Sequence, residues 1–343
     1  MYAEWQEVMT HFEDDRFGVL FARIEKFTQR LARFIGSQPG GIWVDQNSSS
    51  LLSRVALGLP RGKRNRVVTT DLEFPSARLV FGAIPGVEMV VVPSDLEHGK
   101  IDAQRVADAI DERTWAVFAS HATTATGALL KTSPIADKAR RHGAWFGLDI
   151  YQSVGCVPVD VRKLGADFAV GGGHKWMLGA WDLGYAWMSE RLLREFTPTT
   201  SGWMAGEDPF TFAEQRGLTK DARCLATGAP DPLASMLSDA GLDELDAETL
   251  AVIRQRSVSL CEQVIERSRW PIRSPREADQ RGGTVSLAVP DAPWVREQLL
   301  ARHVVVSARQ LPDHSTVLRV APHFYNSSDD IEALFEALKE ILP

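Results

Sequence analysis

The sequence predicts an α/β protein with a mainly parallel seven-stranded sheet in a large domain and a smaller α+β domain after it. Short apolar runs alternate with helical stretches through the first two thirds of the chain, and this pattern changes after Pro230 and Pro232. At 343 residues the chain is long enough for two domains of roughly 100 to 200 residues each. We therefore expect a helical segment over residues 1–36, a large domain over 37–232 and a small domain over 233–343.

The first expected element is an amphipathic helix over residues 17–34, in which apolar residues recur at spacings of three and four before Gly36 ends it. Short apolar runs predict the strands of the large domain. They cover residues 42–44, 67–70, 89–92, 115–119, 144–148, 168–170 and 185–188. Helices that begin at Asp102 and at Ser133-Pro134 suit the crossover connections of a parallel sheet.

The last third of the chain predicts helices first and then a short sheet. Two long helices are expected over residues 233–245 and 247–268. Strands follow over 284–289, 304–307 and 317–320, with a helix after the first of them and a final helix over 329–341. We interpret this region as the small C-terminal α+β domain.

The composition limits the class of protein. An apolar fraction of 44% and a charged fraction of 24% are typical of globular chains. A net charge of −7 argues against nucleic acid or an anionic membrane as partner. The sequence has no run of 18 apolar residues and no signal-peptide pattern, so we expect a cytoplasmic location. The cysteines Cys156, Cys224 and Cys261 are odd in number and widely spaced, which predicts reduced thiols and no metal site.

Two reactive side chains are expected at neighbouring strand ends. One strand ends in Asp149, and another runs through three glycines into His174 and Lys175. The carboxyl ends of parallel strands line the ligand crevice, so this acid and this amine can face one small molecule. A buried lysine loses its proton readily and can form a Schiff base with an aldehyde, while a carboxylate beside a pyridine nitrogen keeps that ring protonated. The three glycines, Gly171 to Gly173, would let the backbone approach a flat ligand.

Each of these residues could also serve an ordinary structural purpose. Lysines are usually solvated, and an aspartate at a strand end is often a helix cap. A glycine run before His-Lys is a short motif that occurs by chance. The residues around Asp149 and Lys175 therefore decide between the two interpretations.

These surrounding residues form a specific combination of motifs. The motifs are Asp149-Ile150-Tyr151-Gln152-Ser153-Val154-Gly155, Pro158-Val159-Asp160, Gly165-Ala166-Asp167 and His174-Lys175-Trp176. Together they resemble the class V aminotransferase family, which includes cysteine desulfurases, kynureninases and isopenicillin epimerase-like proteins. The resemblance runs from about residue 40 to the C-terminus.

The resemblance implies a homodimeric enzyme of the pyridoxal-phosphate-dependent fold type I, with pyridoxal 5'-phosphate (PLP) as cofactor and an active site at the dimer interface. By this likeness Lys175 holds the cofactor as a Schiff base and Asp149 contacts the ring nitrogen. Gln152 would donate a hydrogen bond to the ring oxygen, and His174 would lie beside the phosphate or the Schiff base.

The resemblance also assigns residues to the phosphate and the ring. Ser48 and Ser49 open a helix after the first strand, where an anionic phosphate is favoured, although a serine there can simply cap the helix. Phe74 would stack on the cofactor, with core packing as the simpler interpretation. Thr123 is matched to a residue that contacts the ring oxygen or the substrate carboxylate, and the adjacent Thr124 is equally polar.

Three further matches concern the dimer and the substrate. By the likeness Trp203 would reach the phosphate of the neighbouring subunit, and Thr227 would donate to that phosphate across the dimer. The turn holding Thr227 departs from the family's usual Gly-Thr-Pro order. Arg319 stands in a segment that resembles the family's clamp for the substrate carboxylate, and a guanidinium suits that role because it offers two parallel donors.

The reaction stays open among transamination, elimination, racemisation and side-chain cleavage. A persulfide-forming desulfurase needs a nucleophilic cysteine before Arg319, and no cysteine lies between Val304 and Arg319. His174 and Gln152 stand where kynureninases usually have tyrosine and histidine. We expect a lyase or aminotransferase acting at the α carbon of an L-amino acid or a related metabolite. Because only about 40 residues precede the first strand, the alternative is a non-catalytic binding protein of the same fold.

Overall fold

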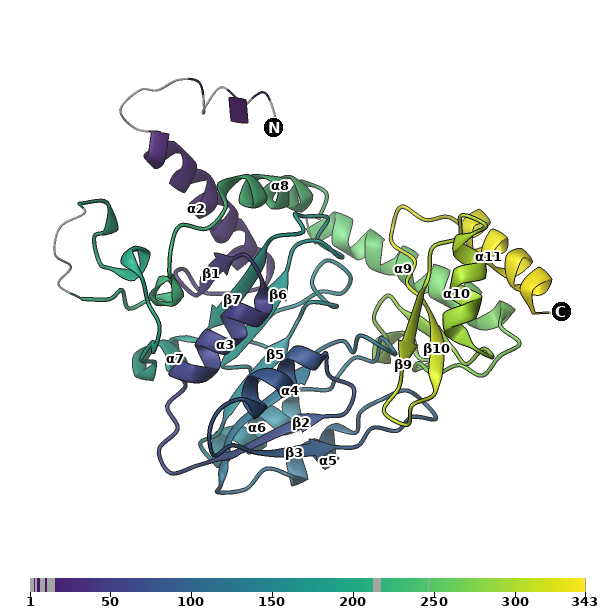
Figure 1. The fold of residues 1–343 in the computed structure, drawn as a ribbon, viewed down its shortest axis with the longest axis horizontal. Helices are drawn as coiled ribbons and strands as arrows, with labels where there is room; N and C mark the ends of the chain where they lie inside the picture. Colours follow the sequence, from purple (N-terminus) through teal and green to yellow (C-terminus); the bar gives the residue numbers. More distant parts are fainter. Residues whose placement is uncertain are drawn as a thin grey trace.

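A seven-stranded sheet forms the centre of the larger part of the structure, a computed structural model (Figure 1). The structure describes residues 16–211, 217–245 and 247–342, together with Ala3, Trp5, Gln6 and Thr10. The strands are β1 (Ile42–Asp45), β2 (Arg66–Thr70), β3 (Glu88–Val92), β4 (Thr114–Ser120), β5 (Trp145–Asp149), β6 (Phe168–Gly172) and β7 (Gly184–Met188). Their order across the sheet is β1-β7-β6-β5-β4-β2-β3, and only β7 runs in the direction opposite to the other strands. The expected mainly parallel sheet is confirmed.

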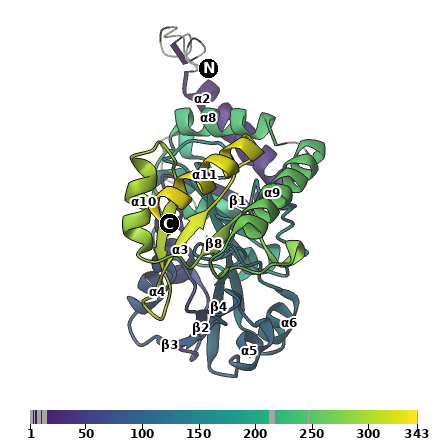
Figure 2. The same cartoon turned by 90° about the vertical axis from the view of Figure 1, so that its right-hand side faces the viewer.

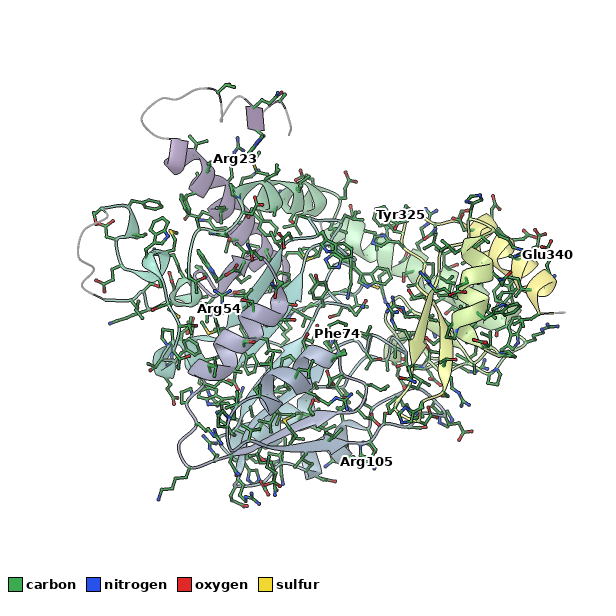
Figure 3. The ribbon with its side chains drawn as sticks, viewed as in Figure 1. Arg23, Arg54, Phe74, Arg105, Tyr325 and Glu340 are labelled. Carbon is green, nitrogen blue, oxygen red and sulfur yellow. The ribbon has the colours of Figure 1, made fainter. Side chains whose placement is uncertain are left out.

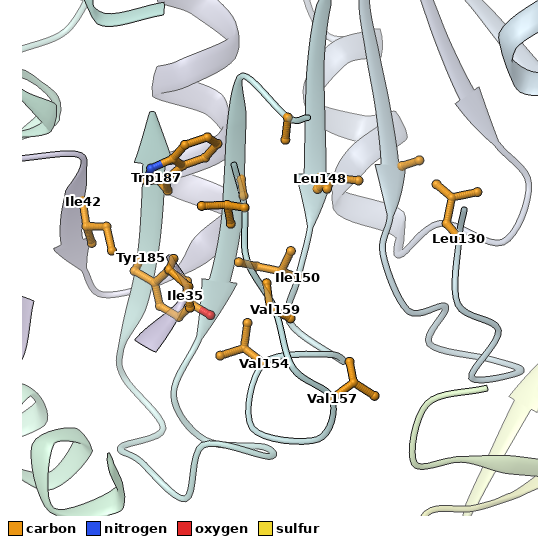
Figure 4. Packing of buried hydrophobic residues seen from close by; sticks show 14 of the residues in the cluster. Ile35, Ile42, Leu130, Leu148, Ile150, Val154, Val157, Val159, Tyr185 and Trp187 are labelled. Carbon is orange, nitrogen blue, oxygen red and sulfur yellow. The ribbon is translucent and has the colours of Figure 1, made fainter. Parts of the chain in front are cut away.

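Helices cover both faces of this sheet, which explains why its strands read as continuous apolar runs. On one face lie α2 (Arg16–Phe34), α5 (Ala103–Asp108) and α6 (Ser133–Arg141). On the other lie α3 (Ser48–Gly58) and α4 (Pro75–Gly82). Every residue of β4 is buried, with Val117 in the first cluster and Phe118 in the second. Figure 4 shows part of the first cluster, in which Ile35 and Ile42 pack near Tyr185 and Trp187.

A second, antiparallel sheet of three strands lies at one end of the molecule (Figure 2). It consists of β8 (Val285–Leu287), β10 (Thr316–Val320) and β9 (Ser307–Gln310), in that order. The helices α10 (Ala292–Leu300) and α11 (Ser328–Ile341) pack on it and share its separate core. The remaining elements are α7 (Glu190–Glu195), α8 (Pro232–Asp243), α9 (Ala247–Arg267) and the 3-10 turns η1 (Trp203–Ala205), η2 (Pro209–Thr211), η3 (Ala222–Leu225) and η4 (Ala278–Gln280).

The helix α8 packs on α2 rather than on the small sheet. Arg30 of α2 contacts Asp239 of α8 at 2.6 Å, and Lys26 contacts the same carboxylate at 2.7 Å. The next helix, α9, contacts β8 and α11. The predicted boundary at residue 232 stays a prediction, and we propose that the small domain begins nearer to α9. None of the helices in the described ranges has the length and apolar character needed to cross a membrane.

The strand β9 begins three residues later than the sequence predicts. The backbone N–H of His303 bonds the carbonyl of Leu300 at 3.0 Å, and that of Val304 bonds Leu299 at 2.9 Å. With His303 at a φ of +63°, these bonds form a Schellman motif that ends α10. Val305 is 81% exposed, so the apolar run from Val304 belongs to a turn. The prediction of a strand over 304–307 is therefore wrong.

Candidate active site

A cavity of about 360 Å³ opens at the carboxyl ends of β5 and β6. The large sheet contributes its strand ends, α3 and α4 contribute their first residues, and the small sheet contributes a residue of β9. Figure 3 labels Phe74 where α4 begins, on the side that faces the small sheet. The cavity brings together six of the residues that the sequence singled out: Ser48, Ser49, Phe74, Asp149, His174 and Lys175.

The amine of Lys175 lies between two aromatic rings near an acid. Its Nζ is 4.3 Å from the centre of the Tyr151 ring and 6.0 Å from that of Phe74. Burial lowers the pKa of Lys175 to about 8, and the nearby cations Arg319 and Arg309 act in the same direction while Asp149 opposes them. The amine is therefore much easier to deprotonate than a solvated lysine.

Asp149 is the last residue of β5 and lies half-buried in the wall of the cavity. Its Oδ1 accepts a hydrogen bond from the backbone N–H of Tyr151 at 2.8 Å. Burial raises the pKa of Asp149, whereas that hydrogen bond and the charge of Lys175 counteract the rise. A protonated ring nitrogen placed beside this carboxyl would favour its ionised form.

Two aromatic residues that the sequence analysis assigned no role hold the imidazole of His174. The hydroxyl of Tyr151 is 2.8 Å from Nδ1 of His174, and the ring of Trp181 stacks on the imidazole with centroids 4.1 Å apart. Burial and the charge of Lys175 lower the pKa of His174, which favours the neutral ring. Tyr151 also has a raised pKa of about 12 because of its burial and of Asp149, so its phenol stays protonated.

The glycines before Lys175 make room for tyrosine rings of the protein itself. A Cβ at Gly172 would lie 2.2 Å from the Tyr151 ring, and one at Gly171 would lie 2.4 Å from the ring of Tyr185. At Gly171 and Gly172 the structure thus shows a packing role, and the expectation that the three glycines admit the backbone close to a flat ligand stays a prediction. Gly172 serves the site indirectly, because it lets the Tyr151 ring lie beside Lys175.

The N-terminus of α3 forms the end of the cavity that suits a phosphate. The cap is Asn47, whose side chain accepts a hydrogen bond from the N–H of Ser50 at 2.8 Å. The first N–H groups of an α-helix have no partner within the helix, and at α3 they belong to Ser48 and Ser49. The hydroxyl of Ser49 lies 2.8 Å from that of Ser76. Because Asn47 caps the helix, both cavity serines stay available for an anion.

Two predicted cofactor contacts do not line the cavity. Thr123 is buried, and its hydroxyl lies 2.7 Å from that of Thr126 and accepts from the N–H of Ala128 at 3.0 Å. Thr124, the adjacent and equally polar residue, lines the cavity in its place. Gln152 accepts a hydrogen bond from the indole of Trp176 at 3.1 Å and is not among the residues that line the cavity.

The two residues expected to act across a dimer, Trp203 and Thr227, do not line the cavity. Trp203 is 42% exposed in η1, and its ring contacts that of Phe210 in an edge-on arrangement. Thr227 is exposed, and its carbonyl approaches Gly202 so closely that no Cβ would fit there. Their contact with the phosphate of a second subunit stays a prediction.

Arg319 of β10 is held near the cavity by one backbone carbonyl and one side-chain hydroxyl. Its Nη1 donates to the carbonyl of Thr124 at 2.9 Å, and its Nη2 donates to the hydroxyl of Ser307 at 3.3 Å. Its buried Nε has no partner among the described residues. Burial and the neighbouring Arg309 lower the pKa of Arg319 to about 10, so the guanidinium stays charged at neutral pH. Arg319 is not among the residues that line the cavity, and its contact with a substrate carboxylate stays a prediction.

Glu73 carries a buried carboxyl group close to that of Asp149. It accepts hydrogen bonds from the hydroxyls of Thr70 and Ser120, both at 2.6 Å. Ser120 pairs with Asp149 in the sheet, so the two carboxyl groups are neighbours. Burial raises the pKa of Glu73 to about 7, and Asp149 adds to the rise. The sequence assigned Glu73 no role, because Ser120 and Asp149 come from strands that only the fold brings next to it.

Known proteins match this chain over nearly its whole length. A family model described as "Aminotransferase class-V" matches residues 11–334. The chain is similar to an uncharacterized aminotransferase of Bacillus subtilis, YcbU, at 25% identity over 95% of this chain and 83% of that protein. It is similar to a probable cysteine desulfurase of Methanothermobacter thermautotrophicus at 27% identity over 93% of this chain and 84% of that one. Isopenicillin N epimerase and kynureninase sequences also match.

Solved structures share the fold at lower identity. A mutant of C-DES with glycine linked covalently to its PLP cofactor matches with a TM-score of 0.85 at 23% identity. The match covers 98% of this chain and 90% of that chain. At this identity the likeness concerns the fold, and it extends to both sheets because nearly all of each chain is included.

Proposed function

The chain belongs to the class-V aminotransferase family, and on that premise we propose that it acts as a lyase or aminotransferase at the α carbon of an L-amino acid or a related metabolite. Its relatives are enzymes, its fold is that of the PLP-dependent fold type I, and its cofactor is pyridoxal 5'-phosphate. The observation that carries the proposal is the shared cavity of Lys175 and Asp149, in which the amine has a pKa of about 8.

The residues of the cavity fit this cofactor. The N–H groups and hydroxyls of Ser48 and Ser49 would hold its phosphate at the start of α3. Phe74 would cover the ring, and Asp149 would keep the ring nitrogen protonated. Lys175 would hold the aldehyde carbon. When bound, pyridoxal phosphate withdraws electrons from the α carbon of an amino acid and so weakens the bonds at that carbon.

Two basic side chains, Arg319 and Lys175, would orient the substrate and move its proton. Arg319 would bind the substrate carboxylate through donors that its contacts with Thr124 and Ser307 leave free. The amine of Lys175, whose pKa burial lowers to about 8, would accept the α proton near neutral pH when it is not bonded to the cofactor. Tyr151 and Trp181 would keep the imidazole of His174 in place beside this amine.

We propose a reaction other than persulfide formation. All three cysteines are buried, and burial raises the pKa of Cys156 and Cys224 to about 12 and that of Cys261 to about 11. A thiolate is the nucleophile that sulfur transfer needs, and these thiols stay protonated. A relative is named as a probable cysteine desulfurase, so cysteine belongs in any test of substrates.

We also propose that the enzyme is a cytosolic homodimer. Trp203 and Phe210, 42% and 45% exposed, place two large aromatic rings together on the surface, as protein interfaces often do. Three free cysteines suit a reducing compartment. Light scattering of the purified protein measures the first point directly, and a single-subunit mass would contradict it.

The proposal is tested by incubating the PLP-loaded protein with a panel of amino acids in deuterated water. Mass spectrometry should detect α-deuterium in at least one amino acid and identify the product formed from it. Lys175→Ala protein, prepared in the same way, should catalyse no exchange. Absence of exchange across the panel would contradict the proposed function, and sulfide release from cysteine would contradict the exclusion of desulfurase chemistry.

A further inference from the structure

The small sheet presents a second guanidinium to the cavity beside that of Arg319. We propose that the substrate is an amino acid with an acidic side chain and that Arg309 binds this second acidic group. The inference rests on the proposed function, because it assumes that an amino acid binds between Lys175 and Arg319. It adds the substrate class and the residue that selects it.

The pairing of β9 with β10 places both arginines on one face. In this antiparallel pair Arg309 lies opposite Val317, and Ser307 lies opposite Arg319. Residues two apart on a strand point to the same side of the sheet, and so do directly opposed residues. Arg309 and Arg319 therefore project from the same face at diagonal positions. Arg309 lines the cavity, and Arg319 bonds the backbone of Thr124 in its wall.

Arg309 has no carboxylate partner in the described part of the chain. Its Nη1 donates to the carbonyl of the adjacent Ala308 at 2.9 Å. The other N–H donors of the guanidinium can therefore bind a ligand. Some arginines elsewhere pair with acids, as Arg54 does with Asp45 and Arg66 with Glu88 at 3.0 Å. Others, such as Arg254 and Arg281, bond backbone carbonyls but line no part of this cavity. Burial and the nearby Arg296 lower the pKa of Arg309, as expected for a cation that lacks a counter-charge.

The cavity has more positively charged than negatively charged side chains. Lys175, Arg309 and Arg319 are the cations at this site, and Asp149 is the acidic side chain in its described wall. The cofactor phosphate would lie at the N-terminus of α3, and Asp149 would be engaged by the ring nitrogen. The carboxylate common to all amino acids would pair with Arg319. That assignment leaves Arg309 without an anion unless the substrate supplies one.

A carboxylate on the substrate side chain would meet this need. A guanidinium binds a carboxylate through two parallel hydrogen bonds, whereas the amide of the same shape offers one acceptor and no charge. A site built around a buried charge discriminates against a ligand that leaves that charge unpaired. The acidic amino acid should therefore bind at least about tenfold more tightly than its own amide.

The experiment measures dissociation constants from changes in the absorption spectrum of the PLP-loaded protein, so it does not depend on turnover. Three acids, aspartate, glutamate and 2-aminoadipate, are each titrated against their side-chain amides. The wild-type protein, Arg309→Gln and Arg296→Gln are compared. Arg296 is the matched control, since it is an exposed arginine of α10 near Arg309 and lies outside the described cavity wall.

We expect at least one acid to bind about tenfold or more tightly than its amide to the wild-type protein and to Arg296→Gln. Arg309→Gln should lose this preference because only the acid binds more weakly. Equal binding of acid and amide by the wild-type protein would overturn the inference. Equal weakening of both ligands by Arg309→Gln would also overturn it, because Arg309 would then share the α-carboxylate with Arg319.

The two proposals fail in distinguishable ways. If neutral and acidic amino acids perturb the spectrum alike, and the perturbation needs Lys175, the proposed function stands and only the substrate class is wrong. If no amino acid perturbs the spectrum, the proposed function fails and this inference fails with it. Circular dichroism of each variant confirms that a lost signal does not reflect unfolding.

Discussion

Replacing Glu73 by glutamine should stabilise the protein at alkaline pH and leave it unchanged in acid. The carboxyl group is 7% exposed, and its pKa of about 7 lies above the ordinary value of 4.5 that holds in the unfolded chain. Below pH 4.5 the carboxyl group is protonated in both the native and the unfolded state, and its hydrogen bonds contribute fully to the unfolding free energy. As the pH rises through the folded pKa, the native state is left with an ionised group that burial disfavours.

The size of this effect follows from the shift. One pKa unit corresponds to 1.36 kcal/mol, so a shift of about 2.5 units lowers the unfolding free energy by about 3 kcal/mol above pH 7. Glutamine accepts from one of the two hydroxyls, Thr70 or Ser120, and donates to the other, as a protonated carboxyl group does, and it carries no charge at any pH. The difference between Glu73→Gln and the wild-type protein should therefore grow by about 3 kcal/mol from pH 4.5 to pH 8.

Urea titration of the cofactor-free protein, followed by tryptophan fluorescence, measures this difference at both pH values. Glu336→Gln serves as the control, because Glu336 is an exposed glutamate of α11, and it should change stability by less than about 0.5 kcal/mol. A difference between Glu73→Gln and wild type that does not vary with pH would refute the reasoning. It would mean that the pKa of Glu73 is not raised in the native state relative to the unfolded chain.

Three further changes test the arrangement around the amine. Tyr151→Phe keeps the ring and loses the bond to the imidazole, so cofactor affinity should persist while turnover falls roughly 100-fold in a steady-state assay. Asp149→Asn removes the acid that raises the pKa of Lys175, so that pKa should fall below about 8. The pH profile of cofactor binding, measured on the cofactor-free variant, should therefore move to lower pH. An unchanged or upward-shifted profile would contradict this. Gly172→Ala forces a Cβ to 2.2 Å from the Tyr151 ring and should destabilise the fold by about 1 to 3 kcal/mol in urea titration, whereas Gly82→Ala, with open space at its Cβ, should not.

The strands of the large sheet could be predicted from the sequence because both faces of the sheet are covered. A continuous apolar run such as 115–119, flanked by helical stretches, is typical of a strand buried on both faces, and β4 is buried at every residue. The sequence pattern placed Asp149 at a strand end, and the structure has it as the last residue of β5. Strand ends and motif residues were thus accessible from one-dimensional patterns.

Contacts that depend on strand order were not accessible. Glu73 bonds Ser120 because β2 lies next to β4 in the sheet, although β3 comes between them in sequence. The choice between Thr123 and Thr124 depends on which way each side chain turns in a loop. Tyr151 belongs to one of the motifs around Asp149, yet its contact with Lys175 requires the space that Gly172 leaves.

The strand β9 shows how a local error hides a functional residue. The apolar run from Val304 has the pattern of a strand. However, a Schellman motif around His303 includes Val304, and the strand starts at Ser307. The predicted strand ended at Ser307, so Arg309 lay outside it and no side of the sheet was predicted for its side chain. A helix C-terminus that closes with a histidine rather than glycine gives little signal in sequence, because few residues other than glycine favour a positive φ.

The most direct test of the account is to locate the lysine that carries the cofactor. The protein is incubated with pyridoxal phosphate, reduced with borohydride, digested and analysed by mass spectrometry. The account predicts that the reduced phosphopyridoxyl group lies on Lys175, and that Asp149→Asn weakens its incorporation without moving it. Modification of another lysine, or none above the level found with Lys175→Ala, would contradict the claim that this amine and this carboxylate share one cofactor site.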